Sequence, residues 1–101
     1  SAPGMPKSGH MTNQQAKVCA AAVIELMSGR AANPAPVMTN TCYSYVSDRE
    51  VIHVASVHQW NDAQGTILPV KGAGGVSAAR NELEGKYAWA WAQNIWADML
   101  A

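Results

Sequence analysis

The sequence predicts a single α+β domain in which a helix is followed by a three-stranded antiparallel sheet and a second helix. Three observations support this prediction. Apolar residues recur at helical spacing near both ends of the chain. Residues 39–70 contain three short runs with the residue types and the alternation that are typical of strands. The length of 101 residues suits one modest core.

The overall charge and hydropathy exclude two kinds of partner. Seven basic and seven acidic residues cancel, so no charged surface for nucleic acid or an anionic membrane is expected. No apolar run is long enough to span a bilayer. The chain also begins without the charged and apolar segments of a signal peptide, so the signal of an exported protein would lie upstream.

The first helix is predicted over residues 12–27. Thr12 and Gln15 have the spacing of a capping box, and Gly29 favours an end of the helix just before it. Residues 1–9 are rich in proline and glycine and are expected to be irregular. The apolar face of the helix is expected to contain Ala16, Cys19, Ala20, Val23, Leu26 and Met27.

The three strands are predicted over residues 39–47, 51–60 and 66–70. Residues 61–65 end in glycine and form the predicted hairpin loop between the second and third strands. Pro69 lacks a backbone donor, so the third strand is expected at an edge of the sheet.

The last helix is predicted to begin at Ser77, as its cap, and to run to Ala101. The glycine-rich residues 72–75 are interpreted as a flexible lead-in, because the lysine and hydroxyl residue of a phosphate loop are absent. Trp89 and Trp96 fall outside the core stripe, which predicts an aromatic surface for a partner or a larger assembly. The core stripe is expected to contain Leu83, Tyr87, Trp91, Ile95 and Met99.

Cys42 is the leading candidate for chemistry. It follows Thr41 and precedes Tyr43 at the predicted start of a strand, where a thiol can be reached; a buried, inert cysteine is the alternative. A nucleophilic pair between Cys42 and one of the three histidines is conceivable, although no spacing selects it. His53 and His58 are five residues apart on a strand and so face opposite sides, and the third histidine is remote in sequence, so no metal site is predicted.

The start of the first helix is a second candidate for binding. Lys7 and Gly9 directly precede it, and free amides at a helix N-terminus attract an anion or an electron-rich carbonyl. An ordinary exposed helix start is the alternative. The carboxylates are interpreted as solvated charges rather than as a catalytic pair; they are Asp48, Glu50, Glu82 and Glu84.

Several segments, in the same order along the chain, resemble the C-terminal part of the flavoprotein subunit of flavocytochrome c sulfide dehydrogenase. The most specific are Pro-Lys-Ser-Gly at residues 6–9 and Asn-Thr-Cys-Tyr-Ser at residues 40–44. The other similar stretches are residues 13–23, residues 72–77, residues 87–89 and residues 94–99.

This resemblance implies a periplasmic oxidoreductase that oxidises sulfide with FAD and passes electrons to a cytochrome c subunit, which alone carries heme. It implies that Cys42 is one half of a redox-active disulfide whose other cysteine lies upstream. Thr41 and Tyr43 would flank the cysteine at the flavin. The residues implied to line the flavin ring are Lys7, Ser8, Gly9 and Thr12.

The sequence departs from the family in one large respect. It contains no G-x-G-x-x-G fingerprint to hold the ADP part of FAD. Residues 1–101 are therefore expected to form the C-terminal domain of a longer flavoprotein, similar to the interface domain of FAD-dependent disulfide-reductase-like flavoproteins. The FAD-binding domains would be absent here, and the chain alone is expected to be inactive and to bind FAD weakly.

Two alternatives remain open at this point. The domain could be a dimerisation or cytochrome-binding module, with Trp89, Trp91 or Trp96 exposed and no direct redox role. A weaker alternative is a free-standing domain in which Cys19 and Cys42 form a disulfide.

Overall fold

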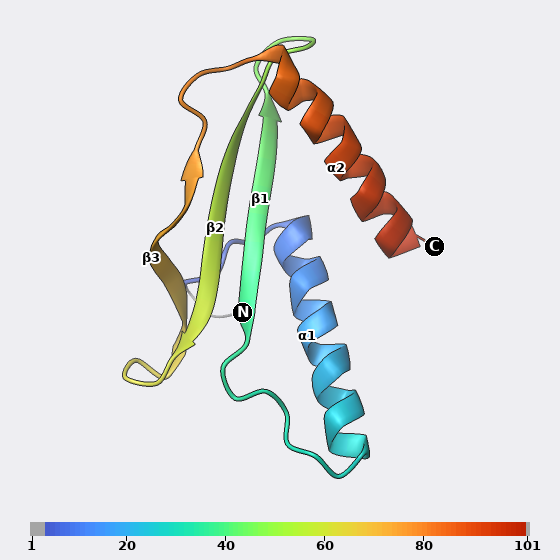
Figure 1. The fold of residues 1–101 in the computed structure, drawn as a ribbon, viewed down its shortest axis with the longest axis vertical. Helices are drawn as coiled ribbons and strands as arrows, with labels where there is room; N and C mark the ends of the chain where they lie inside the picture. Colours follow the sequence, from blue (N-terminus) through green and yellow to red (C-terminus); the bar gives the residue numbers. More distant parts are fainter. Residues whose placement is uncertain (1–3, 101) are drawn as a thin grey trace. The chain divides into compact units, whose positions relative to one another are not determined.

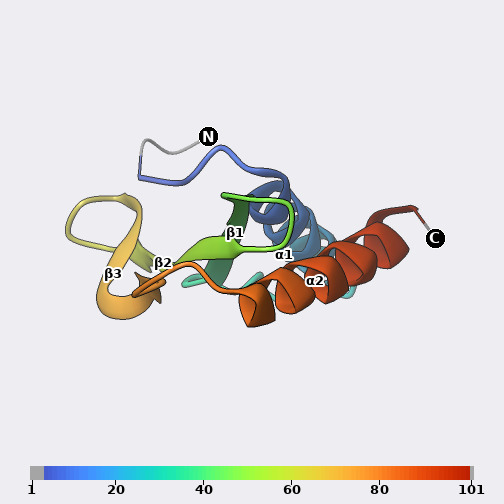
Figure 2. The ribbon, with the colours of Figure 1, turned by 90° about the horizontal axis from the view of Figure 1, so that it is seen from above.

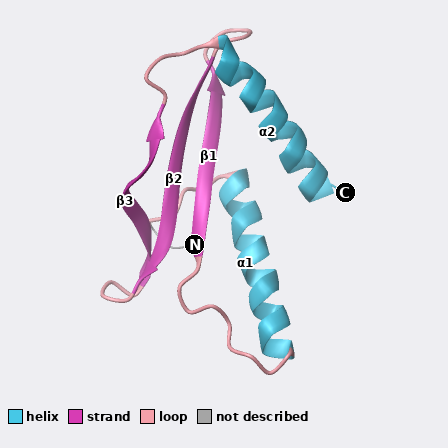
Figure 3. Cartoon of the chain, in the orientation of Figure 1, coloured by secondary structure: helices cyan, strands magenta, loops and turns pink. Residues whose placement is uncertain are grey.

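The computed structural model describes residues 4–100 and confirms the predicted order of elements (Figure 1). The three strands form one sheet in the order β1-β2-β3, and their alternating directions make it antiparallel (Figure 3). The elements are α1 (Gly9–Met27), β1 (Val37–Tyr45), β2 (Val51–Asn61), β3 (Thr66–Val76) and α2 (Glu82–Leu100).

The chain divides into two compact units. Unit 1 consists of Ser1–Asn40 and Ser56–Ala73, and unit 2 consists of Thr41–Ala55 and Gly74–Ala101. All three strands contribute residues to both units, whereas α1 belongs to unit 1 and α2 to unit 2. Each unit therefore has its own helix and its own part of the sheet.

The first helix begins one turn earlier than predicted. Ser8 is its N-cap, and the Ser8 hydroxyl accepts a hydrogen bond from the Met11 amide at 3.1 Å. The Thr12 amide and hydroxyl both donate to the Ser8 carbonyl, each at 2.9 Å, so Thr12 lies inside the helix. The predicted capping box at Thr12 is wrong because Ser8, four residues earlier, already supplies the cap.

The buried side of α1 also differs from the prediction. Met11 is 1% exposed and Asn13 9% exposed, so the buried residues of α1 lie in its first turns, which pack against the rest of unit 1. Cys19 and the larger side chains of the predicted apolar face are instead exposed, with Met27 at 85%. The predicted core face is therefore wrong, because the described part of unit 1 does not cover it. Its large exposed residues are Val23, Leu26 and Met27.

The first two strands are paired so that Tyr43 lies against His53. Val46 donates its amide to the Glu50 carbonyl at 2.9 Å and closes the turn between the strands. The rings of Tyr43 and His53 have centroids 5.9 Å apart. Because β1 begins at Val37, Cys42 lies well inside the strand and not at its start.

The third strand is longer than predicted and includes the glycine-rich segment. Gly72 and Gly74 have φ angles of 81° and 104°, which side chains other than glycine rarely tolerate. β3 bends along its length (Figure 2). Such glycines are common at strand bulges. Because β3 runs to Val76, the glycine-rich segment is part of the sheet and not a flexible lead-in. The edge position predicted from Pro69 is confirmed.

The last helix begins at Glu82 and not at Ser77. The side chain of Asn81 accepts the Glu84 amide at 2.7 Å and caps the helix. Asn81 also exchanges both backbone hydrogen bonds with Val51, which joins the helix start to β2. Ser77 forms other hydrogen bonds, which are described below.

The buried side of α2 is centred on Ala88, which is 4% exposed. Trp91 and Ile95 of the predicted stripe are half-buried, and Leu83, Tyr87 and Met99 are at least half exposed. Gly85 determines this orientation. A Cβ atom there would collide with the Arg49 carbonyl oxygen and would lie 3.8 Å from Val51, which is fully buried. The missing side chain lets α2 approach the turn between β1 and β2 closely.

Candidate functional site

The unit 1 part of the predicted site lies at the start of α1. The Ser8 hydroxyl donates a hydrogen bond of 2.5 Å to the side-chain oxygen of Asn40, which is 4% exposed at the end of this unit's part of β1. Lys7 and Gly9 on either side of Ser8 are exposed. The hydrogen bond therefore connects the start of the helix to the strand that continues into Thr41 and Cys42.

The unit 2 part of the predicted site lies on β1. Cys42 is half-buried and is not part of a disulfide, and Thr41 and Tyr43 beside it are also half-buried. The ring of Tyr43 contacts Trp91 of α2, with centroids 5.5 Å apart and a tilt of 58°. Tyr43 is thus fixed between β2 and α2, and its neighbour Cys42 lies on a well-supported strand.

The structure brings the predicted residues together in two groups. Lys7, Ser8, Gly9 and Thr12 belong to unit 1, and Thr41, Cys42 and Tyr43 belong to unit 2. That both groups lie at the same flavin, as the resemblance implies, stays a prediction. The alternative of a Cys19–Cys42 disulfide is wrong, because the structure forms no disulfide at either cysteine.

His53, Ser77 and Glu84 form a cluster in unit 2 that the sequence pattern does not predict. The Ser77 hydroxyl lies 2.8 and 2.7 Å from the two carboxylate oxygens of Glu84 and 2.8 Å from the His53 amide. The His53 Nδ1 contacts Glu84 Oε1 directly and lies 2.9 Å from the Ser77 hydroxyl. Glu84, which was expected to be solvated, has a side chain only 13% exposed.

The arrangement is not that of a serine hydrolase, although the residue types are the same. In a hydrolase the serine hydroxyl bonds to the Nε2 of the histidine, and the carboxylate bonds to Nδ1. Here both Ser77 and Glu84 lie at Nδ1 of His53. The cluster therefore positions the imidazole and leaves Nε2 directed elsewhere.

The Glu84 carboxyl has a pKa below its ordinary value. The hydrogen bond from Ser77 is the largest cause, and the hydrogen bond and charge of His53 act in the same direction, while burial opposes them. The folded chain therefore binds this proton less readily than the unfolded chain. Its contribution to stability is present above the ordinary pKa of 4.5 and is lost as the pH falls through the lower folded value.

A Glu84→Gln variant tests this pH dependence. We expect wild-type stability, measured by urea unfolding, to exceed that of the variant at about pH 6 and to lose most of that excess by about pH 3. Glu82→Gln is the matched control, because Glu82 is an exposed carboxylate of the same helix turn. If the free energies of unfolding of wild type and Glu84→Gln differed by the same amount at both pH values, the pKa of this carboxyl would be the same in the folded and the unfolded chain.

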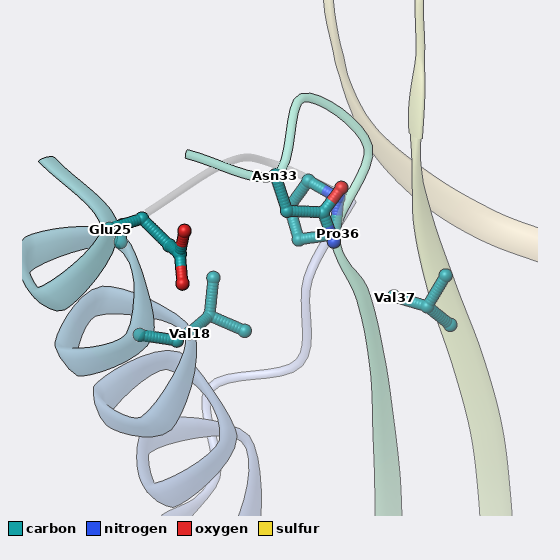
Figure 4. Close-up of a pocket in the computed structure, with 7 residues that line it drawn as sticks. Val18, Glu25, Asn33, Pro36 and Val37 are labelled. Atoms are coloured by element: carbon teal, nitrogen blue, oxygen red, sulfur yellow. The ribbon is translucent and has the colours of Figure 1, made fainter. Parts of the chain in front are cut away.

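Two surface grooves contain no residue of the predicted site. The groove in unit 1 lies between α1 and the segment that leads into β1 (Figure 4), and it is mostly apolar. The groove in unit 2 is formed by α2 and the end of β1, with Tyr45 and Trp89 among its residues. The unit 1 groove is lined by Val18, Ala21, Ala22, Glu25, Asn33, Pro36 and Val37.

The other histidine of the sheet, His58, is buried in unit 1 at 2% exposure. Its Nε2 lies 2.8 Å from the Ser56 hydroxyl, and its Nδ1 has no partner within residues 4–100. Residues 4–100 contain no cluster of three or more histidine, cysteine, aspartate or glutamate side chains that could hold a metal ion. None of the helices in this range is both long and apolar enough to cross a membrane.

The fold and site define an α+β domain with a half-buried thiol on its sheet in one unit and an open helix start in the other. A family model described as "Flavocytochrome c sulphide dehydrogenase, flavin-binding" matches residues 34–100. The match covers about two thirds of the chain, and the chain belongs to this family. It is thus a flavin-binding domain of a sulfide dehydrogenase flavoprotein, which is an oxidoreductase. Cys42 and Tyr43 lie within the match, whereas the residues at the start of α1 precede it.

Proposed function

We propose that this chain is the C-terminal domain of a sulfide-oxidising flavoprotein and that it contributes both a redox-active cysteine and part of the flavin pocket. Cys42 forms a disulfide with a cysteine of the region upstream. Thr41 and Tyr43 flank that disulfide at the flavin. The residues that line the flavin ring are Lys7, Ser8, Gly9 and Thr12.

The hydrogen bond between Ser8 and Asn40 is the observation that carries this proposal. It joins the helix start to β1 only two residues before Cys42 in the chain. Both partners are polar side chains, and Asn40 is almost fully buried, so the bond fixes the strand as well as the helix. A cofactor pocket requires that the elements around it, here α1 and β1, have fixed positions.

The start of α1 is chemically suited to one edge of a flavin ring. A Cβ atom added to Gly9 would have no atom within 4 Å, so there is open space beside this residue. The first amides of a helix attract electron-rich carbonyls, and the exposed Lys7 adds positive charge. The pyrimidine end of a flavin presents such carbonyls.

The bound flavin supplies two-electron oxidation. Cys42 contributes thiol–disulfide exchange, in which hydrosulfide attacks the disulfide that Cys42 forms. Cys42 is only half-buried in this chain, which is compatible with such an attack. Trp91 of α2 packs against Tyr43 of the same strand and thereby supports it. This chain alone is expected to be inactive, since the ADP part of FAD requires the upstream domains.

A partner-binding role for α2 is a second candidate. Trp89 and Trp96 are 55% and 51% exposed and pack edge to face with centroids 5.9 Å apart. Exposed aromatic pairs are typical of protein interfaces. The partner would be the cytochrome c subunit, which carries the heme and accepts the electrons in the periplasm. This role is compatible with the redox role of Cys42.

Substitution of Gly9 by valine in the intact flavoprotein tests the flavin pocket. The added side chain fills the open space beside the helix start without a clash in this chain. We expect a lower flavin content per protein, or a shifted visible absorption band. Ala16→Val is the matched control, because Ala16 is exposed on the same helix. Identical flavin content and spectra for wild type and both variants would place the flavin elsewhere.

A further inference from the structure

The part of the sheet that belongs to unit 2 has one covered face and one open face. α2 covers the face that carries Tyr43 and His53, through the contacts of Trp91 with Tyr43 and of Glu84 with His53. Successive side chains of a strand point to opposite faces, so Cys42, beside Tyr43, belongs to the other face. The cysteine of the proposed redox centre therefore lies on the face that α2 does not cover.

The pairing of β1 with β2 identifies the neighbours of Cys42 on this face. The two strands pair with Tyr43 opposite His53, as their ring contact and the hydrogen bond that closes the turn indicate. In this antiparallel register Val54 lies directly opposite Cys42. Ile52, two residues before Val54 on the same strand, points to the same side.

The third strand extends the same row of side chains. The Ser77 amide donates to the His53 carbonyl at 3.0 Å, which places Val76, the last residue of β3, opposite Val54. Cys42, Val54 and Val76 therefore lie side by side across the three strands of unit 2.

This face, which we call the Cys42 face, is uncharged and open to solvent. Ile52 is 38% exposed, Val54 46% and Val76 74%. A sheet face that remains in water is usually polar, so apolar residues here indicate a surface that is covered in the complete protein. The Cys42 face consists of Cys42, Ser44, Ile52, Val54 and Val76.

We propose that the Cys42 face is the docking surface for the upstream segment that carries the cysteine partner of Cys42. This segment packs apolar side chains against Ile52, Val54 and Val76. The proposal rests on the redox function proposed for Cys42, and it adds the surface that holds the two cysteines together.

The geometry of a disulfide favours this segment as the occupant. The Cα atoms of two bridged cysteines lie roughly 4.4–6.8 Å apart. Side chains of a strand stand roughly perpendicular to the sheet, so a cysteine bonded to Cys42 must belong to a backbone that passes over the open face. The residues next to that cysteine then contact Val54, which lies opposite Cys42, and its apolar neighbours.

The extent of the face argues against a second copy of this chain as the occupant. Three partly exposed aliphatic side chains provide much less than the roughly 800 Å² per partner that a stable complex buries. A segment of the same protein needs less contact area, because its effective concentration at the face is high. The absence of charge on the face also disfavours a partner that binds through ion pairs.

Photo-cross-linking in the intact flavoprotein tests the proposal. Val76, the most exposed apolar residue of the face, is replaced by benzoylphenylalanine, and the cross-linked peptides are identified by mass spectrometry after irradiation. We expect the main cross-link to join residue 76 to the peptide around the cysteine that pairs with Cys42. Benzoylphenylalanine in place of Leu83 is the matched control, because Leu83 is 55% exposed in the same unit but lies on α2. It should not cross-link to that peptide.

The alternative occupants give different products. Cross-links from residue 76 to a second copy, to the cytochrome subunit or to peptides away from that cysteine would overturn the proposal, and so would the absence of any cross-link. Disulfide mapping of the wild-type protein separates this failure from that of the proposed function. If Cys42 is bridged while residue 76 cross-links elsewhere, the redox function stands without this docking surface; if Cys42 is a free thiol, both are wrong.

Val54→Thr tests the apolar contact by a second measurement. Threonine keeps the size and the strand propensity of valine but places a hydroxyl in the proposed interface. Weaker docking lowers the effective concentration of the partner cysteine. In the anaerobic intact protein, we therefore expect the Cys42 disulfide to become two thiols at an about tenfold lower ratio of reduced to oxidised dithiothreitol.

Val37→Thr is the matched control for this titration. Val37 is a 52% exposed valine on β1, but it belongs to unit 1 and lies outside the Cys42 face. Its midpoint should equal that of wild type. Equal midpoints for wild type and Val54→Thr would contradict the docking of an apolar segment on this face.

Discussion

Replacing Cys42 by serine in the intact flavoprotein is expected to lower the rate of flavin reduction by sulfide by about two orders of magnitude or more. A serine hydroxyl cannot form the disulfide that hydrosulfide attacks, so the path through thiol exchange is lost. Stopped-flow bleaching of the flavin absorption under anaerobic conditions measures the rate. The flavin content should stay close to that of wild type, because Cys42 is not among the residues assigned to line the ring.

Cys19→Ser is the matched control for this experiment. Cys19 is an exposed, free cysteine on α1, so its loss should leave the sulfide reaction unchanged. If Cys42→Ser reduced the flavin as fast as wild type, the cysteine would have no redox role. The domain would then be assigned to partner binding, with the exposed Trp89 and Trp96 as its leading surface.

Gly85→Val is expected to destabilise this chain by about 1–3 kcal/mol or more. Any Cβ at this position collides with the Arg49 carbonyl oxygen, which belongs to backbone and cannot rotate away. The helix must therefore move off the turn between β1 and β2, and the contact that buries Val51 loosens. Urea unfolding of the chain measures the change.

Gly75→Val is the matched control for the packing of α2. Gly75 lies in the same unit, and a Cβ there would meet no atom within 4 Å. Its effect should be small, since valine suits a strand. Equal unfolding midpoints for wild type and Gly85→Val would mean that the helix does not depend on this close approach.

The order of elements could be predicted because it depends on local patterns. Helical spacing at both ends and alternation in the middle are properties of short windows of sequence. The first residue of a helix could be predicted less well where two nearby residues could each serve as its N-cap. Ser8 and Thr12 are both good caps, and only the structure shows that Ser8 bonds to Met11 and to Asn40.

The buried faces of the helices could not be derived from apolar spacing alone. Leu26 and Met27 fit the predicted stripe of α1, yet they are exposed in the described chain. The side of α2 that faces the sheet follows from Gly85, whose close approach to Arg49 joins residues distant in sequence. Coverage by other domains of a longer flavoprotein would explain why apolar residues occupy exposed positions.

The candidate site was predictable only where its residues are neighbours in the chain. Cys42 with Thr41 and Tyr43 forms one short segment, which a resemblance to a known family can identify. The His53 cluster combines His53 of β2 with Ser77, which directly follows β3, and with Glu84 of α2, at separations of 24 and 31 positions. No spacing rule links them, because pairing of the strands and the start of α2 bring them together.

Disulfide mapping of the intact flavoprotein tests the central claim most directly. The protein is purified without reductant, its free thiols are blocked, and its peptides are analysed by mass spectrometry before and after reduction. The redox role of Cys42 predicts a peptide that contains Cys42 cross-linked to a cysteine upstream of this domain, while Cys19 is blocked as a free thiol. Recovery of Cys42 as a fully blocked, free thiol in the oxidised enzyme would contradict the assignment.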